Sequence, residues 1–276
     1  IWVASSNYAE DLRIDYSILD QHAESYRKIR NTFRYLLGNL NDAFEDKNLD
    51  SLEIPKLPEL EQFMLHKIYK LNLNFDKYFK NYDFHNLYKE LLNFCTVDLS
   101  AFYFDIRKDT LYCDSKESEK RKSTLILLNI ILNSLLKWFA PILSFTTEEI
   151  YQLVVKNKKS IHLEKFLSFP KKFENSELSE KWKRLLKIRD VCNLSIEEKR
   201  ATKEIGSSLE ASLVLKLNKN DSEIIKGVDL SELCITSFVE IKKNDTDDIV
   251  VETSKAEGDK CPVCWKISVK PCARHG

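Results

Sequence analysis

A helical repeat of apolar residues runs through most of this chain, from about Leu19 to Lys203, and limits the possible fold more than any other feature. In the first such segment, apolar side chains recur along one helical face: Tyr26, Ile29, Phe33, Leu36, Leu37 and Leu40. The same period is found in Leu60–Phe79, in Asp83 to about Lys108, and in a stretch from Leu125 to Phe139 that Pro141 ends. Long amphipathic helices joined by short connections predict a mainly α fold, an antiparallel helical bundle.

The pattern changes after Pro170. One more long helix is expected from about Ser176 to Glu204, with Gly206 at its left-handed C-terminal turn. Apolar and polar residues then alternate from Leu209 to Leu217, which is typical of a half-buried strand. The remaining expected elements are strands at Ile235–Ile241 and Ile249–Val251, a short helix at Ser222–Leu233 and a linker at Ala256–Lys260. Together they predict a small α+β module after the bundle.

The last sixteen residues hold three of the seven cysteines, in an arrangement that suits a metal ion. Two pairs of ligand residues, each with a two-residue gap, are Cys261 with Cys264 and Cys272 with His275. Three thiolates and one imidazole can surround a tetrahedral zinc ion, and because such a shell leaves no open position the zinc would be structural. The alternative is a set of free or redox-active thiols. An odd number of cysteines, spaced so unevenly, does not indicate a disulfide framework.

A basic ridge is expected on the first long helix, beside its apolar stripe. It consists of Arg27, Lys28, Arg30, Asn31 and Arg34. Guanidinium groups on a rigid helix suit phosphates and base edges, although they could equally pair with Glu24 or other carboxylates on a solvated face. Trp265 offers a ring that could stack on an unpaired base or pack over the zinc site.

The charge distribution permits a polyanionic partner without requiring one. The formal net charge of the whole chain is zero, whereas residues 111–203 carry 19 basic and 12 acidic side chains. A local excess of this size is also typical of an ordinary solvated helix face.

Catalytic and membrane signatures are absent from the sequence. It contains no glycine-rich phosphate loop and no G-x-S-x-G elbow, and its five histidines are scattered. The longest uncharged stretch, Ser123–Leu136, is too short and too polar to span a bilayer, and no secretory signal begins at Ile1. We therefore expect a cytoplasmic protein without membrane contact, and the missing initiator Met suggests a piece of a longer chain.

Several segments resemble the C-terminal part of the bacterial isoleucyl-tRNA synthetases, a family of class I aminoacyl-tRNA synthetases. The segments that carry the resemblance are IWVASSNYAEDLRI at the start, Ser25–Phe44, Asn86–Asp114, LLKWFAPILSFTTEEI at Leu135–Ile150, IGSSLEASLVL at Ile205–Leu215, and CPVCW at Cys261–Trp265. Some of these segments also look like valyl and leucyl relatives, whereas a terminal CxxCW knuckle is similar to the isoleucyl family in particular.

The resemblance implies a region that binds the anticodon arm of tRNA(Ile), with the basic ridge facing the tRNA and Trp265 close to it. It implies four parts: residues 1–17 leading out of the catalytic domain, 18–172 as the anticodon-binding bundle, 173–256 as the long helix with the α+β junction module, and 257–276 as the zinc-binding tip. The family's ATP-binding signatures, His-x-Gly-His and Lys-Met-Ser-Lys-Ser, do not occur here. ATP, the catalytic domain and the editing domain would then belong to an upstream part, and this chain could not activate isoleucine alone.

Two departures from the family pattern concern the zinc site. The family usually closes the site with a second Cys-x-x-Cys after a longer loop, whereas here the loop has seven residues and His275 takes the last ligand position. Three other hypotheses stay open: a docking module that binds tRNA only together with the catalytic domain, the same region of a valyl or leucyl relative, and a freestanding zinc-dependent hydrolase.

Overall fold

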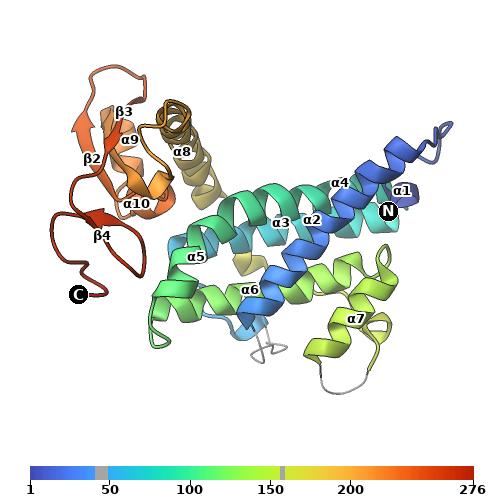
Figure 1. Cartoon of the computed structure of the whole chain (residues 1–276). Helices are drawn as coiled ribbons and strands as arrows, with labels where there is room; N and C mark the ends of the chain where they lie inside the picture. Colours follow the sequence, from blue (N-terminus) through green and yellow to red (C-terminus); the bar gives the residue numbers. More distant parts are fainter. Residues whose placement is uncertain (41–48, 156–158) are drawn as a thin grey trace. The chain divides into compact units, whose positions relative to one another are not determined.

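The computed structural model describes residues 1–40, 49–155 and 159–276, which form two compact units (Figure 1). The helical unit comprises Ile1–Arg107 and Ser115–Asn175, and the mixed unit comprises Lys108–Asp114 and Ser176–Gly276. The described part is mainly helical with a small sheet, as the sequence predicts. The last four residues of the Ser25–Phe44 segment lie outside the described residues.

The helical unit consists of long helices and short turns. Its elements are α1 (Trp2–Ser5), α2 (Tyr16–Leu40), η1 (Leu49–Ser51), η2 (Ile54–Lys56), α3 (Glu59–Lys80), α4 (Phe84–Asn93), the π-helical stretch η3 (Phe94–Tyr103), the start of α5 (Phe104–Cys113), α6 (Glu119–Phe139), α7 (Ser144–Val154), η4 (Ile161–Leu163) and η5 (Lys171–Phe173). The expected break between the second and third long helices falls between α3 and α4.

Helix α6 forms the core of the helical unit. Every residue from Leu127 to Phe139 is buried, and α2, α3 and α7 pack against this helix. The sequence suggested a single apolar stripe, but a helix covered on all sides must bury its other faces as well. Its polar groups therefore need internal partners, and the indole Nε1 of Trp138 donates to Asn72 Oδ1 at 3.1 Å. The helix ends at Phe139, just before Pro141, as predicted.

The mixed unit combines one long helix with two small sheets. Its elements are α8 (Ser176–Ala201), η6 (Ser208–Glu210), β1 (Ala211–Leu217), α9 (Lys219–Ile224), α10 (Leu230–Leu233), β2 (Phe238–Lys243), β3 (Val250–Lys255), β4 (Asp259–Lys260) and β5 (Ile267–Ser268). The first sheet has the order β2-β1-β3, with β1 parallel to β2 and antiparallel to β3. Strand β1 alternates buried and half-buried residues, as expected, and α8 packs against β1 and β3.

The end of α8 differs from the prediction at Gly206. The left-handed residue is Lys203, with φ 60°, whereas Gly206 does not have a positive φ. The amide of Glu204 donates to Lys199 O and that of Lys203 to Arg200 O, each at 3.0 Å, which is the bonding pattern of a Schellman cap. The helix therefore closes three residues earlier than Gly206, whose amide instead donates to Glu210 Oε2 at 2.9 Å.

Three smaller elements also differ from their predicted bounds. The expected helix at Ser222–Leu233 is two short helices, because Gly227 takes a φ of 80° between them. Strand β2 begins at Phe238 because Ile235, with φ 55°, ends α10 in a left-handed turn. The expected linker Ala256–Lys260 contributes its last two residues to β4, which pairs with β5.

Candidate metal centre and nucleic-acid interface

Helix α2 presents the predicted basic ridge to solvent. All five side chains of the α2 ridge, Arg27, Lys28, Arg30, Asn31 and Arg34, are exposed, while Ile29, Phe33 and Leu36 are buried. Because the buried positions repeat every three to four residues, the intervening basic positions must point outward. The ridge is therefore available to a ligand of the helical unit.

Pairing with carboxylates involves one arginine of the α2 ridge. Arg27 Nη1 lies 2.5 Å from Glu24 Oε2, and both side chains are more than half exposed. Within the described residues, Arg30 and Arg34 form no ion pair. A solvated pair such as Arg27 with Glu24 is worth little energetically and does not prevent binding of a stronger anion.

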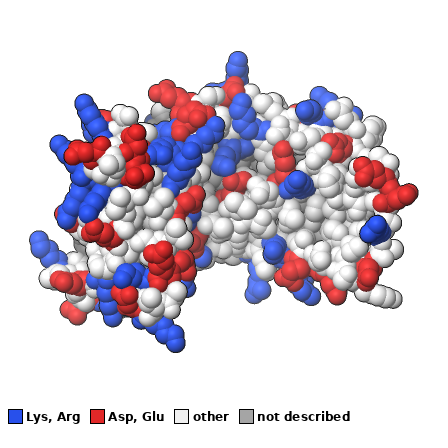
Figure 2. Space-filling view, turned by 90° about the horizontal axis from the view of Figure 1, so that it is seen from above, with Lys and Arg blue, Asp and Glu red and all other residues white. Residues whose placement is uncertain are grey.

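The wider surface carries charges of both signs. On the face shown in Figure 2, Lys and Arg side chains are interspersed with Asp and Glu and separated by wide uncharged areas. A dense polyanion such as nucleic acid normally meets a local basic patch. This face therefore points to a limited contact region rather than to a continuous basic surface.

The four predicted metal ligands come together in the mixed unit. Cys261, Cys264, Cys272 and His275 offer ligand atoms that all lie within 4.8 Å of one another, and the first two residues are buried. The cluster therefore unites two short sequence motifs separated by a seven-residue loop.

The strand pair β4–β5 positions the first two ligands. The amide of Cys261 donates to Lys266 O at 2.9 Å, and that of Trp265 to Cys261 O at 3.0 Å, which folds the Cys261–Lys266 segment into a tight turn. Gly258 precedes the pair with φ 112°, and a Cβ there would lie 2.2 Å from the backbone carbonyl of Ser268. Only glycine fits at this close approach.

The distances within the cluster suit a tetrahedral zinc ion. His275 Nδ1 lies 3.5 Å from Cys261 Sγ and 3.4 Å from Cys272 Sγ, and Cys264 Sγ lies 3.8 Å from Cys272 Sγ. Bonds of about 2.3 Å to sulfur and about 2.0 Å to nitrogen, at tetrahedral angles, place two sulfurs roughly 3.8 Å apart and a sulfur roughly 3.5 Å from a nitrogen. The residues therefore fit this metal in both spacing and donor type.

Backbone amides favour the thiolate form at two of the three sulfurs. Hydrogen bonds from the backbone of Cys264 and Val263 lower the pKa of Cys261 to about 6. A hydrogen bond from the backbone of Arg274 lowers the pKa of Cys272, whereas burial raises that of Cys264. Since a metal binds the thiolate, two ligands are prepared for coordination before the ion arrives.

Trp265 is accessible at the tip of this turn. The residue is 58% exposed, its φ is 64°, and Lys260 Nζ lies 5.1 Å from the ring centroid. Trp265 is thus accessible to solvent beside a cation, an arrangement that single-stranded bases can use for stacking.

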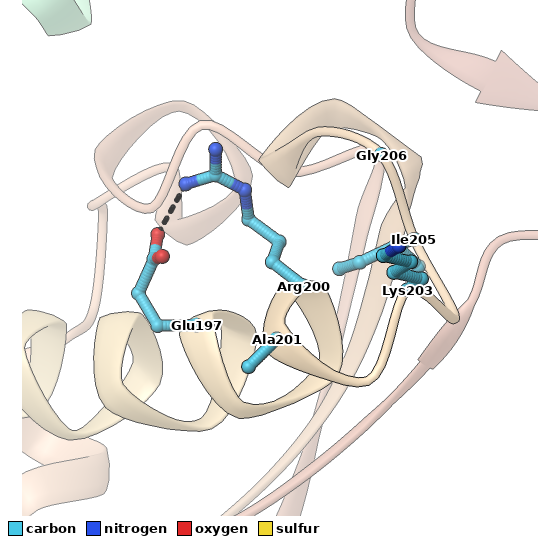
Figure 3. A pocket seen from close by; sticks show the side chains of 6 residues that line it. All are labelled: Glu197, Arg200, Ala201, Lys203, Ile205 and Gly206. Atoms are coloured by element: carbon cyan, nitrogen blue, oxygen red, sulfur yellow. Dashed lines mark hydrogen bonds and ion pairs between the residues drawn. The ribbon is translucent and has the colours of Figure 1, made fainter.

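A hollow of the mixed unit lies where α8 ends (Figure 3). It is lined by Glu197, Arg200, Ala201, Lys203, Ile205 and Gly206. An ion pair joins Arg200 Nη1 to Glu197 Oε1 at 2.5 Å, and the two side chains are 45% and 61% exposed. The hollow therefore offers a solvated helix end and no cluster of catalytic groups.

One part of the metal centre had no signal in the sequence. The segment Lys108–Asp114, at the end of α5, belongs to the same unit as the cluster although about 150 positions separate them along the chain. Neither periodicity nor ligand spacing could have identified this neighbour, because both patterns are local.

Comparison with known proteins identifies the family. The profile described as the anticodon-binding domain of tRNA ligase matches residues 61–215, more than half of the chain. The chain belongs to this family. The matched region begins in the first turn of α3 and ends within β1, so that the family domain extends over parts of both units.

The relatives are isoleucine–tRNA ligases. The chain is 70% identical over 275 residues to the isoleucine–tRNA ligase of Pelagibacter ubique, which covers 100% of this chain and 30% of that protein. It is 39% identical to the enzyme of Kosmotoga olearia, over 98% of this chain and 30% of that protein, and 37% identical to the enzyme of Agrobacterium fabrum, over 97% and 28%. The chain thus spans about 30% of the length of these relatives, and its resemblance to the C-terminal region of isoleucyl-tRNA synthetases is confirmed.

The described helices also bear on the membrane prediction. Within residues 1–40, 49–155 and 159–276, none of the helices is both long and apolar enough to cross a bilayer.

Proposed function

We propose that this chain is the part of an isoleucine–tRNA ligase that recognises the anticodon arm of tRNA(Ile). The observation that carries the proposal is the match of residues 61–215 to the anticodon-binding domain of tRNA ligases, together with 70% identity to an isoleucine–tRNA ligase along the whole chain. The parent enzyme would join isoleucine to its tRNA with ATP in the cytoplasm. Catalytic and editing domains outside this chain would supply the ATP site and the chemistry, so the chain alone should be inactive.

In this proposal the four sequence-based parts keep distinct roles. Residues 1–17 lead out of the catalytic domain, 18–172 form an antiparallel bundle of the class I synthetase type, 173–256 form the junction module, and 257–276 form the tip. The exposed α2 ridge supports a contact with tRNA, because rigid helical arginines offer paired donors to phosphates and base edges. The exposed ring of Trp265 supports stacking at the tip.

We further propose that Cys261, Cys264, Cys272 and His275 hold one structural zinc ion. When bound, zinc would supply a cross-link between the two motifs and no reactive position, because four protein ligands complete its shell. The residues themselves would order the tip by bringing the ends of the seven-residue loop together. A full shell also argues against the hydrolase hypothesis, since hydrolysis requires an open position for water.

A binding titration tests the proposed recognition. The zinc-loaded chain is titrated with tRNA(Ile), and with the same tRNA carrying a replaced anticodon, at two salt concentrations. We expect tighter binding of the native anticodon and a steep loss of affinity with salt, since lysines and arginines that neutralise phosphates release counterions. Equal binding of both tRNAs, or a flat response to salt, would contradict anticodon recognition.

The α2 ridge is tested by single substitutions. If Arg30 or Arg34 reads a base edge, Arg30→Ala or Arg34→Ala should cost about 1–3 kcal/mol of binding and reduce discrimination between the two tRNAs. If the arginine contacts a phosphate instead, its substitution should weaken the binding of both tRNAs alike. Arg200→Ala, which removes an exposed arginine paired with Glu197, is the matched control and should leave affinity unchanged. Unchanged affinity in both ridge variants would exclude the α2 ridge from the interface.

A docking role is the second candidate, favoured by exposed apolar side chains near the start of the chain. Val3 is 62%, Ile14 61% and Tyr16 86% exposed. Such surfaces are typical of contacts with another domain or protein. In this case the chain would bind neither tRNA in the titration and would self-associate in sedimentation experiments. The double variant Val3→Ser with Ile14→Ser should reduce that self-association. A monomeric chain would contradict the docking role.

A further inference from the structure

The last residues of the ligand cluster contact the end of α5. Arg274, between Cys272 and His275, places Nη2 2.6 Å from Asp109 Oδ2 and Nη1 2.7 Å from Asp114 Oδ1. The Arg274 side chain is 36% exposed, and Asp114 only 13%. One planar guanidinium thus bridges two carboxylates in a partly buried position, a geometry that restricts the backbone on either side of it.

The same segment fixes the orientation of the His275 ring. His275 Nε2 lies 3.1 Å from the carbonyl oxygen of Cys113. Because a carbonyl oxygen can only accept, Nε2 must carry the proton in this hydrogen bond. In the neutral ring Nδ1 then holds the free electron pair, and Nδ1 is the atom that faces the sulfurs of Cys261 and Cys272.

The first ligand motif, Cys261–Cys264, also contacts this segment. Cys113 Sγ donates to the carbonyl oxygen of Val263 at 3.5 Å, and Val263 lies between Cys261 and Cys264. Both ligand motifs therefore contact the segment Asp109–Asp114. The tip has few backbone hydrogen bonds after β5, so these contacts are important for its order.

We propose that Asp109 and Asp114 are positioning residues of the metal centre, which act by holding Arg274 and thereby His275 in the ligand geometry. This inference rests on the proposed zinc site. Ordering His275 before the metal arrives reduces the conformational entropy lost on binding. Partners outside the ligand shell commonly set metal affinity in this way, by fixing the ring orientation and its tautomer. The end of α5 would then contribute to zinc affinity without supplying a ligand.

Zinc affinity and a cobalt spectrum test the inference. Asp109→Asn and Asp114→Asn are compared with the unaltered 276-residue chain by competition with a chromophoric zinc chelator. We expect each substitution to weaken zinc binding about tenfold to a hundredfold. With Co²⁺ in place of zinc, the absorption bands of both variants should shift toward those of His275→Ala, because loss of the imidazole changes the ligand field. A variant that merely lost stability would keep the bands of the original ligand set.

The control variant removes a carboxylate from an exposed ion pair of the same unit. Glu223→Gln breaks the pair between Glu223 and Lys226, which are both more than half exposed, and should leave zinc affinity and the cobalt spectrum unchanged. Arg274→Lys provides a second test of the positioning role. It retains the positive charge but cannot bridge two carboxylates with a planar fork, so its zinc affinity should also fall.

The outcomes separate this inference from the zinc proposal. If the unaltered chain binds one zinc ion while the Asp109, Asp114 and Arg274 variants bind it equally well with identical cobalt spectra, the positioning role is wrong and the zinc proposal stands. If the unaltered chain binds no zinc, both are wrong.

Discussion

At the scale of single residues, the helical unit contains a buried ion pair between Glu61 and Arg107. Glu61 is fully buried and accepts hydrogen bonds from Arg107 Nε and Nη2, both at 2.6 Å. Tyr103 and Thr124 donate to the same carboxylate, at 3.0 and 3.2 Å. The positive charge of Arg107 depends on this carboxylate for compensation, because a guanidinium cannot lose its proton in a protein.

Substitution of Glu61 should therefore destabilise the protein strongly. Glu61→Gln leaves the charge of Arg107 buried and uncompensated, and we expect a loss of about 3–5 kcal/mol in the free energy of unfolding. The double variant Glu61→Leu with Arg107→Met removes both charges and should lose less. Urea titrations of both variants measure the difference, and equal losses would show that the charge is not the cause.

At the scale of elements, three helices of the described part of the chain end with non-glycine residues in the left-handed conformation. These residues are Tyr82, Lys203 and Ile235, with φ of 55°, 60° and 55°. With only five glycines in the chain, the caps that glycine usually provides are formed at a cost in backbone strain.

Lys203→Gly should relieve this strain at the end of α8. The left-handed conformation costs an L-residue roughly 1–2 kcal/mol, and the added freedom of glycine in the unfolded chain offsets about 0.4–1 kcal/mol of the gain. We expect a small net stabilisation, visible as a raised melting temperature. Lys203→Ala removes most of the side chain but retains the strain, so a similar increase in that variant would contradict the explanation.

The start of α4 depends on a side-chain cap. Asp83 accepts a hydrogen bond from the amide of Asn86 at 3.2 Å, and Asn86 Nδ2 donates to its other oxygen at 2.8 Å. The Asn86 side-chain hydrogen bond, the largest cause, holds the pKa of Asp83 below its usual value. Asp83→Ala should cost about 1 kcal/mol of stability at neutral pH, while Asp83→Asn, which can also cap, should cost less.

The pH dependence of this cap follows from the direction of the shift. A lowered pKa in the folded state means that the ionised cap stabilises the protein fully above the ordinary carboxyl pKa of about 4, and that this contribution is lost as the pH falls through the lowered value. Asp83→Asn should therefore show a weaker loss of stability in acid than the unaltered chain. Urea titrations at neutral and acidic pH measure this, and parallel losses would contradict the assignment.

At the scale of the whole molecule, removal of zinc should affect the two units differently. The helical unit has its own apolar core around α6, whereas the tip of the mixed unit consists of two short strands and turns. Because metal binding would supply much of the free energy that folds such a tip, a chelator should increase amide hydrogen exchange in residues 259–276 and 108–114. Amides of α6 should keep their protection. Equal deprotection of α6, or no change at the tip, would contradict the proposed role of zinc.

Local patterns in the sequence by themselves determined the class of the fold and the ligand cluster. The helical period predicted the helical unit, the alternation of apolar residues predicted β1, and a two-residue gap in each motif predicted the ligand cluster. These predictions succeed because each reflects the geometry of a few neighbouring residues, which the backbone period alone imposes. The resemblance to isoleucyl-tRNA synthetases was likewise recognised from short segments, and the 70% identity to a relative confirms it.

Only the tertiary structure decided which distant residues meet. It buries every face of α6, and it places the left-handed turn at Lys203 because the last hydrogen bonds of α8 close there rather than at Gly206. It also brings Asp114 to Arg274, 160 positions later in the chain. Such contacts follow from how whole elements pack, and packing energy depends on surfaces that no short stretch of sequence contains.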